Sequence, residues 1–436
     1  MPRLPPRHIN IFSLMRICFL SRRFFPAISG MSVYAINYLR EMVALGHEIV
    51  MISQYRNDDA GTKIYGGGPP PPVKGVKVIG LESVGEQRVN QGQPADFESD
   101  LAAMVTTAFA EHEKKPFDIV HAQYGYPNGL AALEISRRTG IPNAVSIQGG
   151  DGHWVGLCCD THQRGIRSVF DHANELIIGS RSFAEEVYEN HGTPMDRFTI
   201  IPGAINAKRF APSEKRCLGD ISTIPHLLFH GRVDERKGVL ELLDAVKQLH
   251  DRHISLRLTI SGIGPDLERA RNKTITLGLE GSVDLRGYVD YEDVPEIYRE
   301  ADMFVSPTWS EGFSNTILEA MASGLPIVAA RSVGVVDCLT HEHDALFHDV
   351  HDVDGLAAAI ERVIQNETLR RKLAVTALAE IGETYAWPVI ARRLEARLQA
   401  LTGVVPDNAW AARYNPPRFI ADADLSCRFR AAPHLL

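Results

Sequence analysis

Short apolar segments alternate with segments of helical period along most of the chain, and this alternation limits the fold more than any other feature. Near-continuous apolar runs are typical of strands buried on both faces of a sheet. Because successive strand, helix and strand units build a parallel sheet with right-handed crossovers, the pattern predicts an α/β fold. The expected strands are Arg16–Ser21, Glu48–Ser53, Val76–Leu81, Ile119–Ala122, Ala144–Gln148, Leu176–Gly179, His226–His230, Arg257–Ser261, Val283–Arg286, Met303–Ser306 and Ile327–Ala330. The expected helices are Met31–Leu45, Asp96–Lys114, Leu130–Thr139, Val239–His250, Asn315–Ser323, Val353–Ile364 and Trp387–Leu401.

The alternation is interrupted once, where Phe198–Pro202 leads into a linker near Gly203–Pro212. The chain has 436 residues, enough for two domains that each bury a core. Gly66–Pro72, with the sequence GGGPPPP, is expected to be a loop. The expected parts are a flexible extension over residues 1–15, a first domain over 16–204, a second domain over 205–385, a helix over 386–402 and a tail over 403–436. The tail has no steady period, and no secondary structure is predicted for it.

The segment Ser306–Ala330 predicts a strand end, a loop, a short helix, a turn and a further strand. Ser314 is a suitable N-cap for the helix, and Gly324 fits the position after its end. Glu311 is then in the loop that faces the helix N-terminus, and Glu319 is in the second turn. A helix N-terminus suits a phosphate, whereas nearby carboxylates suit the hydroxyls of a ribose or a sugar. The alternative is a capped helix with two solvated glutamates.

A second candidate site follows the buried strand at His226–His230. The strand leads to Gly231, Arg232 and Lys237, and a helix begins directly afterwards. Arginine can contact two oxygens at once and lysine acts as a point charge, so the two cations can bind a diphosphate. A solvated basic loop is the alternative. Both features lie at carboxyl ends of strands, where ligands of open α/β sheets usually bind.

At these motifs the chain resembles a known family. The sequences G-R-x(4)-K-G and E-G-F-x-N-T-x-L-E-A-M-A-x-G-x-P resemble those of the retaining glycosyltransferases of the GT-B fold, family 4. The likeness runs from about Arg16 to about Leu401. It implies two Rossmann-like domains that face each other across a cleft, with the C-terminal helix returning to the N-terminal domain. The C-terminal domain would bind a nucleotide-diphosphate sugar, and the N-terminal domain most of the acceptor.

The resemblance also implies roles for individual residues. Arg232 and Lys237 would hold the donor diphosphate, Glu319 the ribose, and Glu311 the transferred sugar. The residues expected at the donor are Gly30, Gly231, Arg232, Lys237, Glu311, Gly312, Phe313, Asn315, Thr316 and Glu319, of which Arg232, Lys237 and Glu311 are expected to take part in catalysis.

The chemistry expected from these residues is retaining transfer to a hydroxyl. Fixed cations and a helix end can stabilise the charge that grows on the leaving diphosphate, so neither a metal nor a further cofactor is expected. In the front-face path proposed for the family, the leaving phosphate oxygen takes the acceptor proton. Glu311 is therefore not expected to be a nucleophile.

The N-terminal domain departs from the family pattern in places that bear on the acceptor and the sugar. His121, Gln148 and Asp151 are the candidate contacts there, although a lone histidine such as His121 is more often structural. Gln148 stands where many relatives have a histidine near the donor sugar, and it carries no titratable proton. Asn206 and Asp337 also depart from the usual residues, at the expected hinge and in the C-terminal domain.

The expected partners are the nucleotide sugar and a glycan, lipid-linked or small-molecule acceptor, as in polysaccharide biosynthesis. A net charge of −8 gives no indication of bulk nucleic-acid binding. No apolar run reaches membrane-spanning length and no clean signal peptide is present, so a cytoplasmic location is expected. Lys114-Lys115 and Arg137-Arg138 are candidate contacts with the inner face of a membrane; the alternative is ordinary solvated helix ends.

The six cysteines do not indicate a disulfide framework in a chain of this length. Cys158 and Cys159 are adjacent and near His153 and His162, but the spacing matches no familiar zinc pattern. We therefore predict ordinary reduced thiols and no metal site.

Two other classes of function remain open. One is a same-fold enzyme such as a sugar-nucleotide epimerase or a phosphorylase, although no cofactor lysine of a phosphorylase can be identified. The other is a non-catalytic protein that binds a sugar nucleotide. The nucleotide base, the sugar, the acceptor and the linkage are not specified by any motif.

Overall fold

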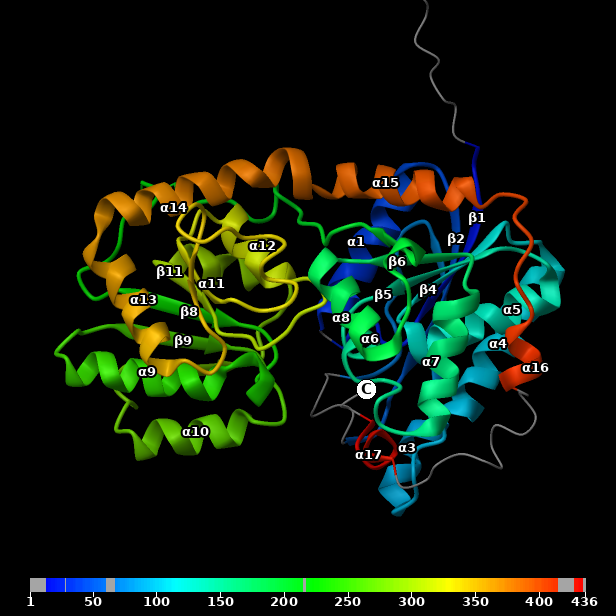
Figure 1. The fold of residues 1–436 in the computed structure, drawn as a ribbon, viewed down its shortest axis with the longest axis horizontal. Coiled ribbons are helices and arrows are strands. Elements are labelled where there is room, and N and C mark those ends of the chain that lie inside the picture. Colours follow the sequence, from blue (N-terminus) through cyan, green and yellow to red (C-terminus); the bar gives the residue numbers. More distant parts are fainter. Residues whose placement is uncertain (1–12, 28, 60–66, 215–216, 415–426, 434–436) are drawn as a thin grey trace, which may run out of the picture.

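The computed structural model describes residues 13–27, 29–59, 67–214, 217–414 and 427–433. They form two parallel sheets, one of seven strands and one of six, each in its own domain. Figure 1 shows the two domains side by side, with helices covering their sheets. Every strand pairing within the two sheets is parallel, as the strand and helix alternation predicts.

The N-terminal sheet has the strand order β3-β2-β1-β4-β5-β6-β7. Its strands are β1 (Arg16–Ser21), β2 (Glu48–Tyr55), β3 (Val76–Glu82), β4 (Ile119–Gln123), β5 (Asn143–Ile147), β6 (Glu175–Ile178) and β7 (Phe198–Ile200). Its helices are α1 (Gly30–Ala44), α3 (Val84–Gln87), α4 (Phe97–Lys114), α5 (Leu130–Thr139), α6 (Gly150–His153), α7 (Asp160–His172) and α8 (Arg181–His191). Strand β1 is buried along its whole length between β2 and β4. The strand order reverses there, so the loops that follow β1 and β4 flank the usual ligand crevice of such sheets.

The C-terminal sheet has the strand order β10-β9-β8-β11-β12-β13. Its strands are β8 (His226–His230), β9 (Arg257–Ser261), β10 (Val283–Gly287), β11 (Met303–Ser306), β12 (Ile327–Ala330) and β13 (Leu346–His348). Its helices are α9 (Val239–Asp251), α10 (Leu267–Thr276), α11 (Val294–Glu300), α12 (Asn315–Ala322), α13 (Val353–Gln365) and α14 (Glu367–Glu380). Apolar side chains pack on both faces of this sheet in two buried clusters. Because β8 and β11 are neighbours in the middle of the sheet, the two predicted phosphate-binding segments come together.

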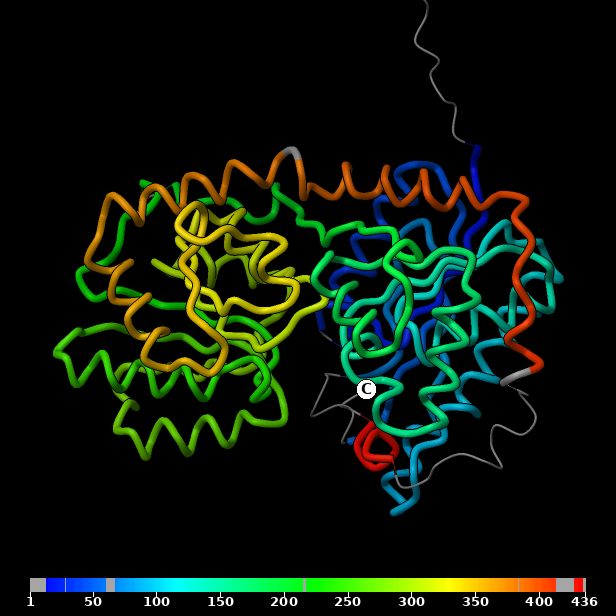
Figure 2. Tube along the Cα trace, viewed as in Figure 1, coloured from blue at the N-terminus to red at the C-terminus, as the bar shows by residue number. Residues whose placement is uncertain are grey.

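The chain passes between the domains twice, at neighbouring positions. Ile205 and Ala386 form a parallel bridge, and Ile205 N donates to Tyr385 O at 2.8 Å. After this crossing, α15 (Trp387–Ala400) packs on α1 of the N-terminal domain, a path that can be followed in Figure 2. His47 Nε2 lies 3.1 Å from Glu395 in that buried interface. The predicted fold, two Rossmann-like domains with a returning C-terminal helix, is confirmed.

Met15, expected at the end of a flexible extension, belongs to the folded N-terminal domain. It is 3% exposed, and its backbone N–H donates to His47 Nδ1 at 3.1 Å. The first twelve residues of the expected extension, and Gly66 of the expected loop, lie outside the described residues. Within the described part of the chain, no helix is both long and apolar enough to cross a membrane.

The C-terminal tail also contacts the N-terminal domain, which the sequence did not predict. Two short helices, α16 (Trp410–Tyr414) and α17 (Arg428–Ala431), follow α15. Trp410 and Phe429 are each 1% exposed and lie in the same buried cluster as the residues of α4, α5 and α7. Trp410 and Phe429 of the tail therefore form part of the N-terminal domain's core.

Candidate active site

The loop after β8 carries the predicted basic residues and is held close to the end of β11. Gly238, which separates this loop from α9, has φ of 70°, and a Cβ there would lie 2.1 Å from Pro307 O. Only glycine fits such a close backbone approach in the left-handed region. This contact sets Lys237 beside the segment that continues to Glu311.

Lys237 and Glu311 form an ion pair, with Nζ 2.6 Å from Oε1. Their side chains are 28% and 20% exposed, so the pair is only partly buried. The structure thus brings together a predicted phosphate-binding cation and a predicted sugar-binding carboxylate, which are 74 residues apart. A diphosphate placed near Lys237 would compete with Glu311 for the ammonium group, and would release the carboxylate for hydroxyl groups.

Arg232 lies near a second carboxylate. Its Nε is 3.5 Å from Asp234 Oδ2, and Asp234 also accepts hydrogen bonds from Arg236 at 2.9 and 2.7 Å. Burial alone would raise the pKa of Asp234, but the hydrogen bonds from Arg236 and the charge of Arg232 outweigh burial and lower the pKa to about 2. Asp234 is therefore ionised and orients the two guanidinium groups. Arg236 also stacks on Trp154 of the N-terminal domain, 4.8 Å from the ring centroid.

Helix α12 begins as predicted, but Ser314 does not cap it in the predicted way. Ser314 occupies the N-cap position, yet among the described residues no side chain accepts a hydrogen bond from the first turn. The Ser314 hydroxyl is instead 3.2 Å from the Thr316 hydroxyl. The first-turn N–H groups near Asn315 and Thr316 are therefore left without a side-chain cap, which suits an anionic ligand.

Glu319 is more buried than the sequence suggests. It is 5% exposed, and its Oε2 accepts a 2.8 Å hydrogen bond from Tyr298. Burial raises the pKa of Glu319 to about 7, although the Tyr298 hydrogen bond and the charge of Arg209 act in the opposite direction. Arg209 itself stacks on Tyr291 with 3.9 Å to the ring centroid. Sequence reasoning missed Arg209 and Tyr298, because the linker and α11 carry no motif that marks them.

Two glycines of the N-terminal domain face α12. A Cβ on Gly30, at the start of α1, would be 3.9 Å from Asn315 Nδ2, and one on Gly203 would be 2.6 Å from Asn315 Oδ1. Gly30 and Asn315, both expected at the donor, are therefore brought together across the domain boundary. The loop that carries Phe313 contacts Gly203 as well.

Gly312 fits tightly against the loops after β5 and β6. A Cβ at Gly312 would lie 2.6 Å from Gln148 O, and Ser180 Oγ donates to Gly312 O at 3.0 Å. The Gln148 side chain is half-buried and accepts a 2.8 Å hydrogen bond from Gln123 Nε2. Gln148 thus lies beside the predicted sugar-binding segment.

The other two candidates on this side are buried and hydrogen-bonded. His121 is 0% exposed, with Nδ1 2.8 Å from Tyr38 Oη and Nε2 2.9 Å from Ser146 Oγ. Burial lowers the pKa of His121 to about 3, so the ring is neutral. Asp151 is also 0% exposed and accepts from the N–H groups of Gly125, Gln148 and Gly149 at 2.7, 3.0 and 2.8 Å. In this structure both residues hold neighbouring segments in place.

Asp337 links the two domains. Its carboxylate accepts from the backbone N–H groups of Arg181 and Ser182, at 2.9 and 3.2 Å, and from the Ser182 hydroxyl. These groups form the first turn of α8, so a residue of the C-terminal domain caps a helix of the N-terminal one. The sequence marked Asp337 only as a departure from the family pattern.

Comparison with known proteins identifies the family of the chain. A family model described as "Glycosyl transferase 4-like domain" matches residues 29–204, and one described as "Glycosyl transferases group 1" matches residues 224–366. The D-inositol 3-phosphate glycosyltransferase of Nocardiopsis dassonvillei is 26% identical over 391 residues, which cover 82% of this chain and 86% of that protein.

Solved structures give the same fold. Sucrose-phosphate synthase from Thermosynechococcus elongatus has a TM-score of 0.73 at 20% identity, covering 89% of this chain and 99% of that one. The Anabaena protein HepE, solved in complex with UDP-glucose, has a TM-score of 0.68 at 17% identity, covering 88% of this chain and 100% of its own. The chain therefore belongs to the group 1, family 4-type glycosyltransferases of the GT-B fold and is a glycosyltransferase.

Proposed function

We propose that the protein transfers a hexose or related sugar from a nucleotide-diphosphate sugar to an acceptor hydroxyl, with retention of anomeric configuration and without a metal ion in the reaction. The Lys237–Glu311 ion pair at the edge of the C-terminal sheet supports this proposal most directly. It joins a group suited to the leaving diphosphate and a group suited to the sugar, as transfer from such a donor requires.

Binding of the donor would rearrange this pair. The diphosphate would lie between Lys237, Arg232 and the N-terminus of α12, and Glu311 would turn to the sugar hydroxyls. Glu319 would accept from the ribose, with Tyr298 holding one of its oxygens. UDP is the first nucleotide to test, because HepE was solved with UDP-glucose.

The chemistry proceeds with one bond broken and one formed at the anomeric carbon. The bond to the diphosphate oxygen breaks, the acceptor oxygen bonds on the same face, and the acceptor proton goes to the leaving phosphate oxygen. Negative charge grows on the diphosphate during this step, and Lys237 and Arg232 would stabilise it. Fixed electrostatic groups of this kind typically contribute about 3 kcal/mol each. Glu311 would orient the sugar and form no covalent bond to it.

A recess on the N-terminal domain suggests the character of the acceptor. It lies at the carboxyl ends of β1 and β2, and Arg22, Arg23, Arg56 and Glu86 are among its lining residues. Arg22 is 2% exposed; it binds Glu86 at 2.7 Å, but its Nη1 atom has no hydrogen-bond partner among the described residues. Burial lowers the pKa of Arg23 to about 9, with help from the charge of Arg22. Arg56 is paired with Asp58, so three guanidinium groups meet two carboxylates here. A phosphate or carboxylate on the acceptor would suit the remaining positive charge.

Each cation of the two basic pairs considered for membrane contact is bound to a carboxylate, although Arg137 and Arg138 share Glu134. Lys114 binds Glu111 at 2.7 Å, and Arg137 and Arg138 bind Glu134 at 2.8 and 2.7 Å. Lys115 pairs with Glu48. This favours solvated helix ends, so we propose a glycan or small-molecule acceptor ahead of a lipid-linked one.

Thermal unfolding with UDP, GDP and ADP, and then with their sugar conjugates, tests the donor. A ligand at about a hundred times its Kd adds about 2.7 kcal/mol to the free energy of unfolding. We therefore expect one of the three nucleotides to raise Tm clearly. The matching sugar nucleotide is then supplied with inositol or inositol 3-phosphate, and the anomeric proton of the product is followed by NMR. We expect a retained product, faster transfer to the phosphorylated acceptor, and no stimulation by Mg²⁺ or Mn²⁺.

Other outcomes would point to the other functions. If none of the nucleotides shifts Tm, the donor site does not work, and a non-catalytic protein would be favoured. Conversion of the donor to an isomer without an acceptor would favour an epimerase. An inverted product would contradict retention while leaving glycosyl transfer intact.

A further inference from the structure

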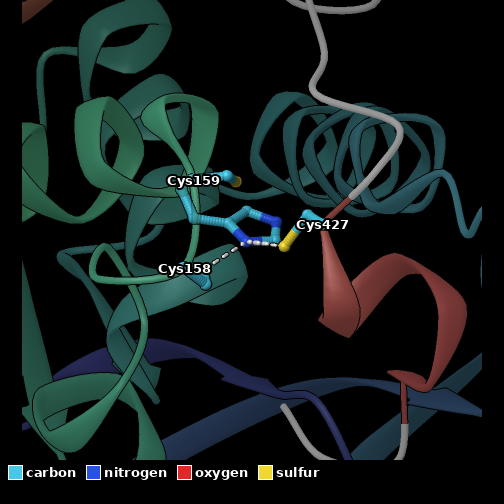
Figure 3. A group of neighbouring side chains, drawn as sticks. Cys158, Cys159 and Cys427 are labelled. Carbon is cyan, nitrogen blue, oxygen red and sulfur yellow. Dashed lines mark hydrogen bonds between the residues drawn. The ribbon is translucent and has the colours of Figure 1, made fainter.

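Three cysteines and one histidine from distant parts of the chain converge beside α7. The ligand atoms of Cys158, Cys159, His162 and Cys427 all lie within 4.8 Å of one another. His162 Nδ1 is 3.1 Å from Cys158 Sγ and 3.5 Å from Cys427 Sγ, and the dashed lines in Figure 3 mark these two contacts. The cluster does not belong to the donor site described above. We propose that these four residues bind a structural Zn²⁺ ion that fastens the C-terminal tail to the N-terminal domain.

The local backbone structure places the side chains of the proposed metal ligands close to one another. Cys159 is the N-cap of α7 with extended backbone angles, φ −169° and ψ 160°, and His162 lies in the first turn of that helix. The motif Cys159-x-x-His162 therefore places a sulfur and a ring nitrogen on one side of a helix start. Cys427 is the residue before α17, and its carbonyl oxygen accepts a 2.8 Å hydrogen bond from the backbone N–H of Arg430, which fixes the start of this turn. The N-terminus of α7 favours a thiolate at Cys159, and the thiolate is the form that binds a metal.

The separations suit a tetrahedral zinc ion. Zinc bonds of about 2.3 Å to sulfur and 2.0 Å to nitrogen place ligand atoms roughly 3.5–3.8 Å apart, so small side-chain rotations would complete the shell. With four protein ligands the site would be closed, as structural zinc sites are. The ion would release the thiol protons on binding and leave three thiolates and a neutral imidazole around it.

The surroundings of His162 favour a metal over ordinary thiol contacts. The ring is 0% exposed and packs against Phe97, Tyr126 and Phe429. Its Nε2 has no hydrogen-bond partner among the described residues, so its polar contacts are those of Nδ1 with sulfur atoms. Sulfur is a weak hydrogen-bond partner, and a buried polar ring satisfied only in this way would be costly. A bond from Zn²⁺ to Nδ1 would replace these weak sulfur contacts with a strong one and leave the ring proton on Nε2.

The ion would hold a segment that borders the acceptor recess. In that segment, Arg430 binds Glu98 at 2.7 and 2.8 Å, and Pro433 O accepts from Arg22 and Arg23 at 3.3 and 3.1 Å. Cys427 is 265 residues from His162, so a metal link between them closes a long loop and restrains the unfolded chain. The sequence missed the site because its fourth ligand lies in the tail, far from Cys158 and Cys159.

Metal analysis of the whole chain tests the proposal. Protein purified without chelator, from cells grown with added Zn²⁺, should contain about one zinc per chain. Exchange with Co²⁺ should give the visible d–d bands and near-ultraviolet sulfur-to-cobalt absorption of a tetrahedral thiolate site. Cys427→Ser and His162→Ala should lose the metal, whereas Cys217→Ser, which alters an exposed cysteine outside the cluster, should keep it.

The structural role has its own measurement. Removing zinc from the wild-type protein should raise hydrogen exchange at the backbone amides of Cys427–Ala432 and leave exchange in the C-terminal domain unchanged. A wild-type protein that binds neither Zn²⁺ nor Co²⁺ when reduced would overturn the proposal. So would an octahedral Co²⁺ spectrum. None of these results depends on the substrate.

Discussion

The two domains build their halves of the candidate active site in different ways. In the C-terminal domain, Lys237 and Glu311 satisfy each other through a partly exposed ion pair that a ligand could replace. In the N-terminal domain, His121 and Asp151 are fully buried and hydrogen-bonded to their own domain. One half therefore holds exchangeable charges, and the other is a rigid support for its loops. A motif residue can therefore contact the ligand or hold the backbone in place. The exposure of its side chain distinguishes the two roles.

Lys237→Ala should produce the largest change, because it removes a contact made with the leaving group. We expect transfer to fall by roughly 10² to 10³-fold, the loss typical of a group that stabilises developing charge. Tm in the absence of donor should change little, since the side chain is partly exposed. Steady-state kinetics with the donor identified by thermal unfolding would measure the loss.

Lys247→Ala is the matched control for this variant. Lys247 lies on α9 in an exposed i, i+4 pair with Asp251, and its loss should leave activity unchanged. Equal activity of Lys237→Ala and Lys247→Ala would show that the ion pair is structural, and would remove the contrast between the two halves.

The pH dependence of stability should reveal the buried carboxylate of Glu319 in the donor half. Burial raises the pKa of Glu319 from 4.5 to about 7, so the folded protein binds more protons than the unfolded chain between these values. The contribution of Glu319 to the free energy of unfolding is therefore fully present below about 4.5 and is lost as the pH rises through about 7. Over that window the loss is up to about 3 kcal/mol.

Urea unfolding of the wild-type protein and Glu319→Gln at several pH values measures this loss. The variant should lack the part of the decline that belongs to Glu319, whereas Glu296→Gln, an exposed glutamate on α11, should follow the wild type. Parallel curves for wild type and Glu319→Gln would mean that Glu319 is ionised and already matched in the free enzyme.

The fold could be predicted from the sequence for many elements that carry their own periodic signal, although the helices α7, α8, α10 and α14 were not predicted. Long buried strands such as β1 and amphipathic helices such as α9 were placed within a residue of their observed ends. Strand β13 has only three residues, too few to show a period, and was missed. The tail was missed for another reason: Trp410 and Phe429 are single apolar anchors in a polar, proline-rich segment, and only tertiary contacts show that they are buried.

In the candidate site, the residue types were easier to predict than their partners. Motif spacing marked Lys237 and Glu311, but only the folded chain shows that they pair with each other. Asp151 was predicted near the acceptor or the sugar from the family resemblance, and the structure shows its carboxylate turned to backbone N–H groups. Spacing along one segment determines which residues share a loop, whereas the direction of a side chain depends on neighbours from other segments.

Asp151→Asn tests whether Asp151 of the N-terminal domain stabilises the backbone rather than binding a ligand. An amide in place of the carboxylate would turn an NH₂ group toward backbone donors, leaving at least one buried N–H without an acceptor. We expect the free energy of unfolding to fall by about 2 kcal/mol, the usual cost of such a loss. Chemical denaturation measures it, with Asp171→Asn, an exposed site on α7, as the control. If Asp151→Asn lost transfer at unchanged stability, Asp151 would be a ligand-binding residue and the two halves would be alike.

Asp337→Ala should have the smallest effect, because it removes a contact between the two domains and no residue of the candidate active site itself. Asp337 caps the first turn of α8 from the opposite domain, and removal of a helix cap typically costs about 1 kcal/mol. The exposed Asp349 of the same domain offers a control, since its nearest cation is 3.7 Å away. If the contact of Asp337 with α8 positions the two domains for the donor, Asp337→Ala should also weaken donor binding measured by calorimetry. Asp349→Ala should leave donor binding unchanged. A loss of stability with unchanged donor affinity would mean that the cap only stabilises α8, and that each half reaches its ligand-binding geometry independently of this contact.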